Sequence, residues 1–116
     1  MHALIIEPQV FTSFMIEDAL RDAGYTSVAM AVTEEEAIAA AEVEPPDLIT
    51  AAVHLQEGSG IEAVKAIRAK HEAPVLFVTQ SVRDVQEEAP QAPVVKKPFR
   101  REDLAQAIAE AQTQQG

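Results

Sequence analysis

The stretch that decides the fold is PDLITAAVHLQEGSG, residues 46–60. Its apolar part, residues 48–53, lacks polar alternation, which is typical of a parallel strand covered on both faces. The EGSG segment that follows favours a turn into a helix, with Ser59 as a candidate N-cap. In open α/β sheets, ligands and chemistry gather outside the carboxyl ends of the strands. This strand reaches that end with Ala51 and Ala52, which can neither titrate nor attack a substrate.

Strands and helices alternate along the whole chain. Short apolar runs predict strands at residues 4–6, 27–32, 48–53, 75–79 and 94–95. Amphipathic segments predict helices at residues 9–23, 33–43, 60–71 and 102–112. Such alternation favours a flavodoxin-like, doubly wound (βα)5 sandwich. Its parallel sheet should have the order 2-1-3-4-5, with helices on both faces.

Two helices carry more detailed predictions. In the first, the spacing of Phe11, Phe14, Met15 and Leu20 places them on one face, which we expect to lie against the core. The fourth crossover has only residues 80–92 before Pro93, and Pro90 and Pro93 restrict the backbone. Because parallel strands need about a dozen residues or more to cross over, we expect a shortened or irregular fourth helix.

Composition limits the class of protein. The chain has 116 residues, 47% of them hydrophobic, which predicts one globular domain over residues 1–111 and a frayed tail at 112–116. The absence of cysteine excludes disulfides and thiolate chemistry, and it suits a reducing compartment. A formal net charge of −10 disfavours nucleic acid and acidic membrane surfaces. We therefore expect a cytoplasmic protein that binds neither.

Five motifs in order indicate a family. ALIIEP places Glu7 after the first strand, PVLFVTQ ends the fourth strand on Thr79, and VVKKPF places Lys97 after the fifth. PDLI begins the third strand, and GYTSVAMA leads into the second helix. With these motifs, residues 3–111 resemble the receiver domain of bacterial response regulators in two-component signalling and phosphorelays.

The resemblance implies a phosphoryl-transfer site. Receivers accept a phosphoryl group from a histidine kinase on an aspartate that ends the third strand. Two acidic residues after the first strand join that aspartate in binding Mg²⁺, a cation that takes oxygen ligands. A Thr or Ser and a Lys, here Thr79 and Lys97, bind the phosphoryl oxygens and relay the change.

The match fails at the residues that carry the chemistry. The phosphoacceptor position falls on Ala52, and the second acidic position falls on Pro8, which leaves Glu7 alone of three carboxylates. The aromatic switch position of the family holds Val94, and the residue after Thr79 is Gln80 rather than a small residue. We therefore interpret the chain as a degenerate receiver, a pseudo-receiver without a phosphoacceptor aspartate.

The remaining polar residues have simpler interpretations. We expect Lys97 to pair with Glu7, and the Thr79 hydroxyl to be satisfied by backbone. The imidazole of His54 is a poor Mg²⁺ ligand, and no cofactor motif is present. Lys96, Arg100 and Arg101 form the single basic cluster of the acidic chain. The cluster is either a solvated face or a docking site for an acidic partner.

Three functions are compatible with these patterns. The first is a non-enzymatic signalling module that binds a protein partner such as a sensor kinase, an output protein or a second copy. The second is a receiver phosphorylated at an unconventional acceptor such as Thr50, Thr79, His54 or Glu57. The third, a flavodoxin-like enzyme or cofactor carrier, has no motif to support it. Only the first hypothesis requires no residue or motif that is missing from the sequence.

Overall fold

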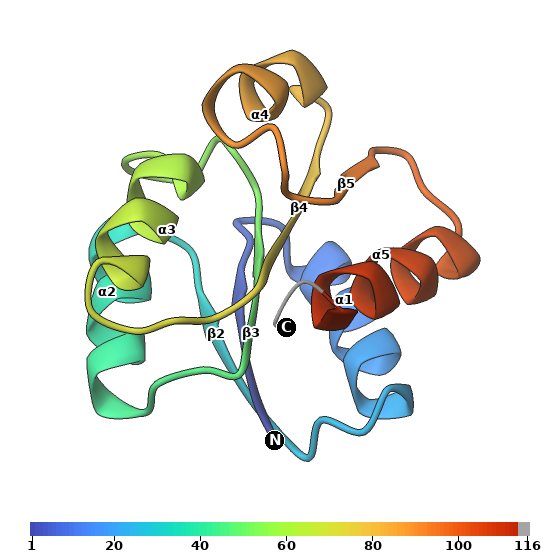
Figure 1. The fold of residues 1–116 in the computed structure, drawn as a ribbon, viewed down its shortest axis with the longest axis horizontal. Helices are drawn as coiled ribbons and strands as arrows, with labels where there is room; N and C mark the ends of the chain where they lie inside the picture. The colour runs from blue at the N-terminus through green and yellow to red at the C-terminus, as the bar shows by residue number, and fades with distance from the viewer. Residues whose placement is uncertain (114–116) are drawn as a thin grey trace.

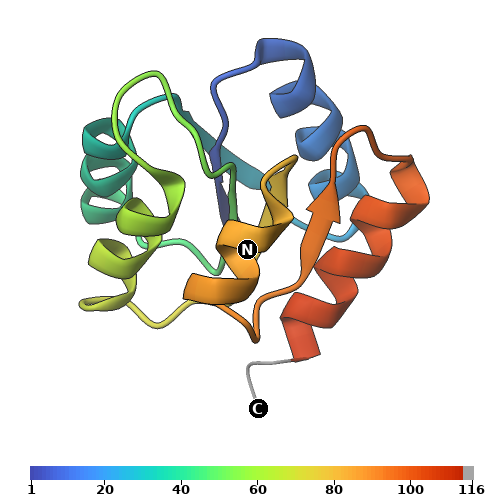
Figure 2. The same ribbon diagram turned by 90° about the horizontal axis from the view of Figure 1, so that it is seen from above.

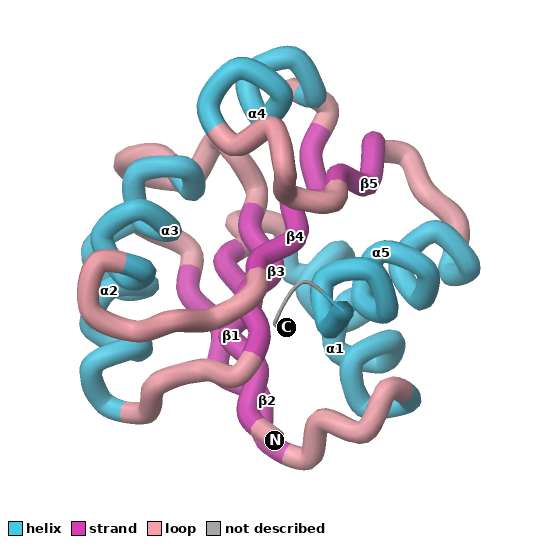
Figure 3. Tube along the Cα trace, in the orientation of Figure 1, coloured by secondary structure: helices cyan, strands magenta, loops and turns pink. Residues whose placement is uncertain are grey.

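The computed structural model describes residues 1–113, which form one layered α/β unit (Figure 1). In chain order the elements are β1 (His2–Ile6), α1 (Val10–Asp22), β2 (Ser27–Ala31), α2 (Glu34–Val43), β3 (Leu48–Ala51), α3 (Gly60–Arg68), β4 (Val75–Thr79), α4 (Val82–Glu88), β5 (Val94–Lys96) and α5 (Arg101–Thr113). The five strands found in this part of the chain pair in parallel in the order β2-β1-β3-β4-β5 (Figure 3). The predicted flavodoxin-like fold and strand order are therefore confirmed.

Each face of the sheet has its own apolar core. Side chains of β1 alternate between the two, so that Leu4 and Ile6 join the core beneath α2 and α3, while Ala3 and Ile5 join the core beneath α1 and α5. Viewed from above, the two helix layers flank the sheet on opposite sides (Figure 2). The central strands are consequently buried throughout, which explains their continuous apolar sequences.

The fourth helix is short, as predicted. α4 spans seven residues, about two helical turns, and contributes one buried side chain, Val85. Beyond it the chain passes Pro90 and reaches β5 without further helix. Because proline lacks the backbone donor that a continuing helix needs, the 90–93 segment returns to the sheet as turn and loop.

The prediction that Phe11, Phe14, Met15 and Leu20 share one buried face of α1 was wrong. Phe11, Phe14 and Met15 are exposed by 84%, 52% and 47%, whereas Leu20 lies against the core on the opposite side of the helix, with Ser13, Ile16 and Ala19. Both stripes have helical spacing, but the stripe through Phe11 continues into the charged Asp18 and Asp22. Burying those carboxylates would cost more free energy than exposing two phenylalanines. The helix therefore packs its other stripe against the core.

The C-terminal helix runs further than predicted. α5 includes Gln112 and Thr113, and the Gln112 side chain donates a hydrogen bond to the Tyr25 hydroxyl at 3.1 Å. The first two residues of the predicted frayed tail, 112 and 113, are therefore helical, and residues 114–116 lie outside the described part of the chain. Among residues 1–113 no helix has the length and apolar character needed to cross a membrane.

Candidate functional site

The carboxyl ends of four strands meet at one edge of the sheet and bring the predicted site residues together. Glu7 follows β1, Ala52 follows β3, Thr79 ends β4, and Lys97 follows β5. Backbone hydrogen bonds fix these ends to one another. The Ala52 N–H donates to the Ile6 carbonyl at 2.8 Å, and the Lys97 N–H donates to the Thr79 carbonyl at 3.0 Å.

An ion pair between Glu7 and Lys97 occupies the centre of this edge. Lys97 Nζ lies 3.0 Å from Glu7 Oε1 and donates a hydrogen bond to Oε2 at 3.1 Å. The Glu7 side chain is fully buried, and that of Lys97 is 17% exposed. The predicted pair is therefore present, and the lysine charge is balanced by a protein carboxylate rather than left for a phosphoryl group.

Gln9 completes this pair, although the sequence patterns gave it no role. Its backbone N–H donates to Glu7 Oε2 at 3.1 Å, and its side-chain oxygen accepts from Lys97 Nζ at 3.4 Å. A polar residue two positions after a strand-terminal carboxylate is the only sequence signal that could have suggested this contact. Gln9 closes a three-residue hydrogen-bonded group with Glu7 and Lys97.

Ala52 lies against the first residue of α3. A side-chain carbon added to Gly60 would stand 1.6 Å from the Ala52 carbonyl oxygen, so only glycine permits this approach. Ser59 caps the helix by accepting a hydrogen bond from the Ile61 N–H at 3.1 Å, as predicted. The methyl group of Ala52 is buried and offers no oxygen or nitrogen to a donor.

Thr79 has a structural partner. Its hydroxyl oxygen accepts a hydrogen bond from the Ser81 N–H at 2.9 Å, so the prediction of backbone satisfaction is confirmed. The Ser81 hydroxyl in turn lies 3.1 Å from His54 Nε2, which ties the loop after β3 to the loop after β4. Gln80 between them is exposed. Sequence reasoning missed Ser81, because no motif marks it.

Among the other candidate acceptors, Thr50 is the most enclosed. It sits within β3 between Ile5 and Leu76, is 1% exposed, and its hydroxyl has no hydrogen-bond partner among the described residues. Such a position is closed to a kinase or a phosphodonor. Val94, at the predicted switch position, is half-buried and packs on the core beneath α3.

The residues at this edge do not fit Mg²⁺. Within the described chain no three His, Asp or Glu side chains converge in a way that could hold a metal ion. The carboxylate of Glu7 is already engaged by Lys97, and Pro8 supplies no side-chain oxygen. A hard cation that prefers several oxygen ligands therefore lacks its ligand set at this edge of the sheet.

The predicted basic cluster is divided in the structure. Arg101 forms an ion pair with Asp22 and a hydrogen bond to the Asp18 carbonyl, so it holds α5 against α1. Lys96 and Arg100 are exposed, and within residues 1–113 neither side chain has an ion-pair or hydrogen-bond partner. Two of the three cations thus remain available to a partner.

Comparison with known proteins agrees with this fold and strand-end arrangement. Residues 3–109 match the family model described as the response regulator receiver domain, and the chain therefore belongs to that family. It is 35% identical to the transcriptional regulatory protein PdtaR of Mycobacterium tuberculosis, over 90% of this chain and 53% of the relative. It is 32% identical to the phyllosphere-induced regulator PhyR of Methylorubrum extorquens, over 93% of this chain and 42% of the relative.

A solved structure supports the same assignment. The solution NMR structure of the receiver domain of PhyR from Erythrobacter litoralis matches with a TM-score of 0.87 and 31% identity. That match covers 97% of this chain and 89% of the other. The chain spans about half the length of the curated relatives it matches. The chain is thus a receiver-type signalling module, similar to one domain of these regulators.

Proposed function

We propose that this domain signals by binding a protein partner without conventional aspartate phosphorylation, as a non-enzymatic pseudo-receiver. The observation that carries the proposal is the Glu7–Lys97 ion pair beside Ala52. It fills the place where other receivers hold a metal and a phosphoryl group, and no carboxylate acceptor stands next to it. The alternative, phosphorylation at an unconventional residue, meets a buried Thr50 and a Thr79 hydroxyl that is already hydrogen-bonded.

The partner surface that we propose comprises α4, β5 and the start of α5. A ligand or partner shifts a conformational equilibrium only by binding one arrangement better than the other. α4 anchors itself with one buried side chain, and a segment with so few buried contacts reorders at low cost. Beside it, Lys96 and Arg100 present two unpaired charges in an acidic domain. A partner with an acidic surface fits this face.

A second candidate surface lies on α1. Phe11, Phe14 and Met15, together with Val10, expose apolar side chains on one end of the helix. Exposed apolar clusters of this kind mark protein interaction sites in soluble proteins. Two of the four phenylalanines of the chain stand here, which makes α1 the main competitor of the basic face.

Charge reversal separates the two surfaces. With the domain immobilised and incubated with extract of the source organism, we expect Lys96→Glu with Arg100→Glu to lower partner capture about tenfold. Capture by the wild-type domain should rise as salt is lowered and should not change when acetyl phosphate is added. Arg101 is left intact because its replacement would break the contact between α5 and α1.

Two further variants act as controls. Lys70→Glu reverses a charge at the end of α3, where Lys70 pairs with Glu42, and it should leave capture unchanged. Phe11→Ser with Phe14→Ser removes the apolar surface of α1 without touching the basic face. Loss of capture in the phenylalanine variant alone would move the partner site to α1. Capture that depends on acetyl phosphate would refute phosphorylation-independent signalling.

A further inference from the structure

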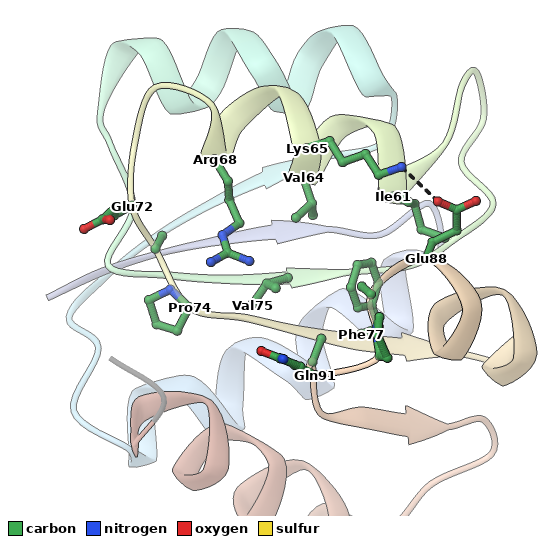
Figure 4. Close-up of a pocket in the computed structure, with 14 residues that line it drawn as sticks. Ile61, Val64, Lys65, Arg68, Glu72, Pro74, Val75, Phe77, Glu88 and Gln91 are labelled. Carbon is green, nitrogen blue, oxygen red and sulfur yellow. Dashed lines mark hydrogen bonds and ion pairs between the residues drawn. The ribbon is translucent and has the colours of Figure 1, made fainter. Parts of the chain in front are cut away.

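A cavity of about 800 Å³ lies on the α3 and α4 side of the sheet, away from the Glu7–Lys97 pair (Figure 4). α3 forms one wall, the segment at residues 88–92 forms the other, and β4 forms the floor. Its lining includes the buried Ile61, Val64, Val75 and Phe77 and the exposed Lys65 and Arg68. A volume of this size is in the range of small-molecule sites, which run from about 300 to 1,000 Å³.

The cavity lies beside the point where α4 ends. Here the helix stops and Pro90 directs the chain back toward β5. The loop at residues 88–92 borders the space without filling it.

Charged residues stand at both ends of the cavity. At one end Lys65 Nζ bridges from α3 to Glu88 Oε2 at 2.9 Å, the contact drawn in Figure 4. The hydrogen bond and charge of Glu88 raise the pKa of Lys65 above its ordinary value of 10.5. At the other end stand Glu72 and Pro74 of the connecting loop.

Arg68 gives the cavity a specific charge. Its side chain extends from α3 toward Pro74 and Val75, into the cavity (Figure 4). Lys65 is tied to Glu62 and Glu88, but Arg68 has neither an ion-pair nor a hydrogen-bond partner among the described residues. A guanidinium presents a fork of donors that matches a carboxylate. Across the cavity, Ala89, Pro90 and Ala92 offer accessible apolar surface to a hydrocarbon body.

We propose that this cavity binds a small organic acid, with its carboxylate on Arg68 and its apolar part against Ala89, Pro90 and Ala92 of the opposite wall. Such a ligand would contact α3, β4 and the segment after α4 together. The ligand would therefore favour the arrangement in which the Lys65–Glu88 bridge is formed, and it would hold α4 in place. The binding energy of a metabolite-sized acid would thus bias the position of α4.

The probe pair is 4-phenylbutyrate and its neutral amide, titrated into ¹⁵N-labelled protein and followed by amide chemical shifts. We expect saturable shifts from the acid at residues 61–68, 75–77 and 88–92, and at least tenfold weaker binding of the amide. Arg68→Gln should weaken the acid at least tenfold, and the exposed site should keep the variant folded. Lys70→Gln, whose side chain faces Glu42 instead, should bind like wild type.

A second readout tests the link to α4. Amide hydrogen exchange at residues 82–92 should slow when the acid saturates the protein, because the ligand bridges both walls. Equal affinity for acid and amide, no saturable shift, or shifts gathered around Arg100 would overturn the proposed site. Normal binding with unchanged exchange at residues 82–92 would overturn its coupling to α4. None of these results tests whether the domain signals without phosphorylation.

Discussion

Replacing Lys97 with methionine is expected to destabilise the domain by about 3 kcal/mol, because it leaves the Glu7 carboxylate buried without its counter-ion. The Glu7 side chain is fully buried, and Lys97 is the one cation that contacts it in residues 1–113. The Gln9 N–H alone would then compensate the charge. Small domains are stable by about 5–15 kcal/mol, so this is a large fraction of the total. Urea denaturation followed by circular dichroism measures it.

A matched double variant shows whether the buried charge is the cause. Glu7→Gln with Lys97→Met keeps the shape of the site but removes both charges, and it should recover more than half of the loss. If Lys97→Met costs less than about 1 kcal/mol, the pair is as weak as an exposed salt bridge. If the double variant is no more stable than the single one, the cost comes from lost packing and not from an uncompensated carboxylate.

Gly60→Ala is expected to cost about 3 kcal/mol or more. Alanine is the better helix former by about 1 kcal/mol, so propensity alone predicts a small gain. The added methyl would instead stand 1.6 Å from the Ala52 carbonyl oxygen and 2.8 Å from its carbon. Both atoms are backbone, so no rotamer change relieves the clash, and α3 must move away from the end of β3.

Gly24→Ala is the control for this substitution. Gly24 has φ of 104° but nothing within 4 Å of the added carbon, so its replacement should cost only about 1–2 kcal/mol of backbone strain. Thermal or urea unfolding of both variants gives the comparison. A neutral or stabilised Gly60→Ala protein would show that α3 does not depend on this contact for its position beside Ala52.

Much of the fold followed from the order of the patterns along the chain. Apolar runs separated by amphipathic segments are compatible with few topologies, since parallel crossovers are right-handed and short. The two prolines between Thr79 and Val94 predicted the short α4. The Glu7–Lys97 pair was predictable because parallel strands end at one edge of the sheet, where two opposite charges meet.

What the sequence did not predict depends on three-dimensional packing. α1 has two stripes of suitable spacing, and the choice between them rests on Asp18 and Asp22 further along the helix. The cavity beside Arg68 needs the placement of α3 relative to the loop after α4, which no local pattern contains. The contact between Ser81 and His54 joins two loops 27 residues apart and leaves no periodic signal.

The most direct test of the central claim is the intact mass of the protein after incubation with acetyl phosphate and Mg²⁺. An ordinary receiver treated alongside establishes that the reagents are active, and Pro8→Asp with Ala52→Asp asks whether restored carboxylates recover the reaction. The wild-type domain should show no phosphoryl adduct, because Ala52 offers no acceptor and Lys97 is held by Glu7. A stoichiometric wild-type adduct that hydroxylamine removes would reveal an acyl phosphate and contradict the account.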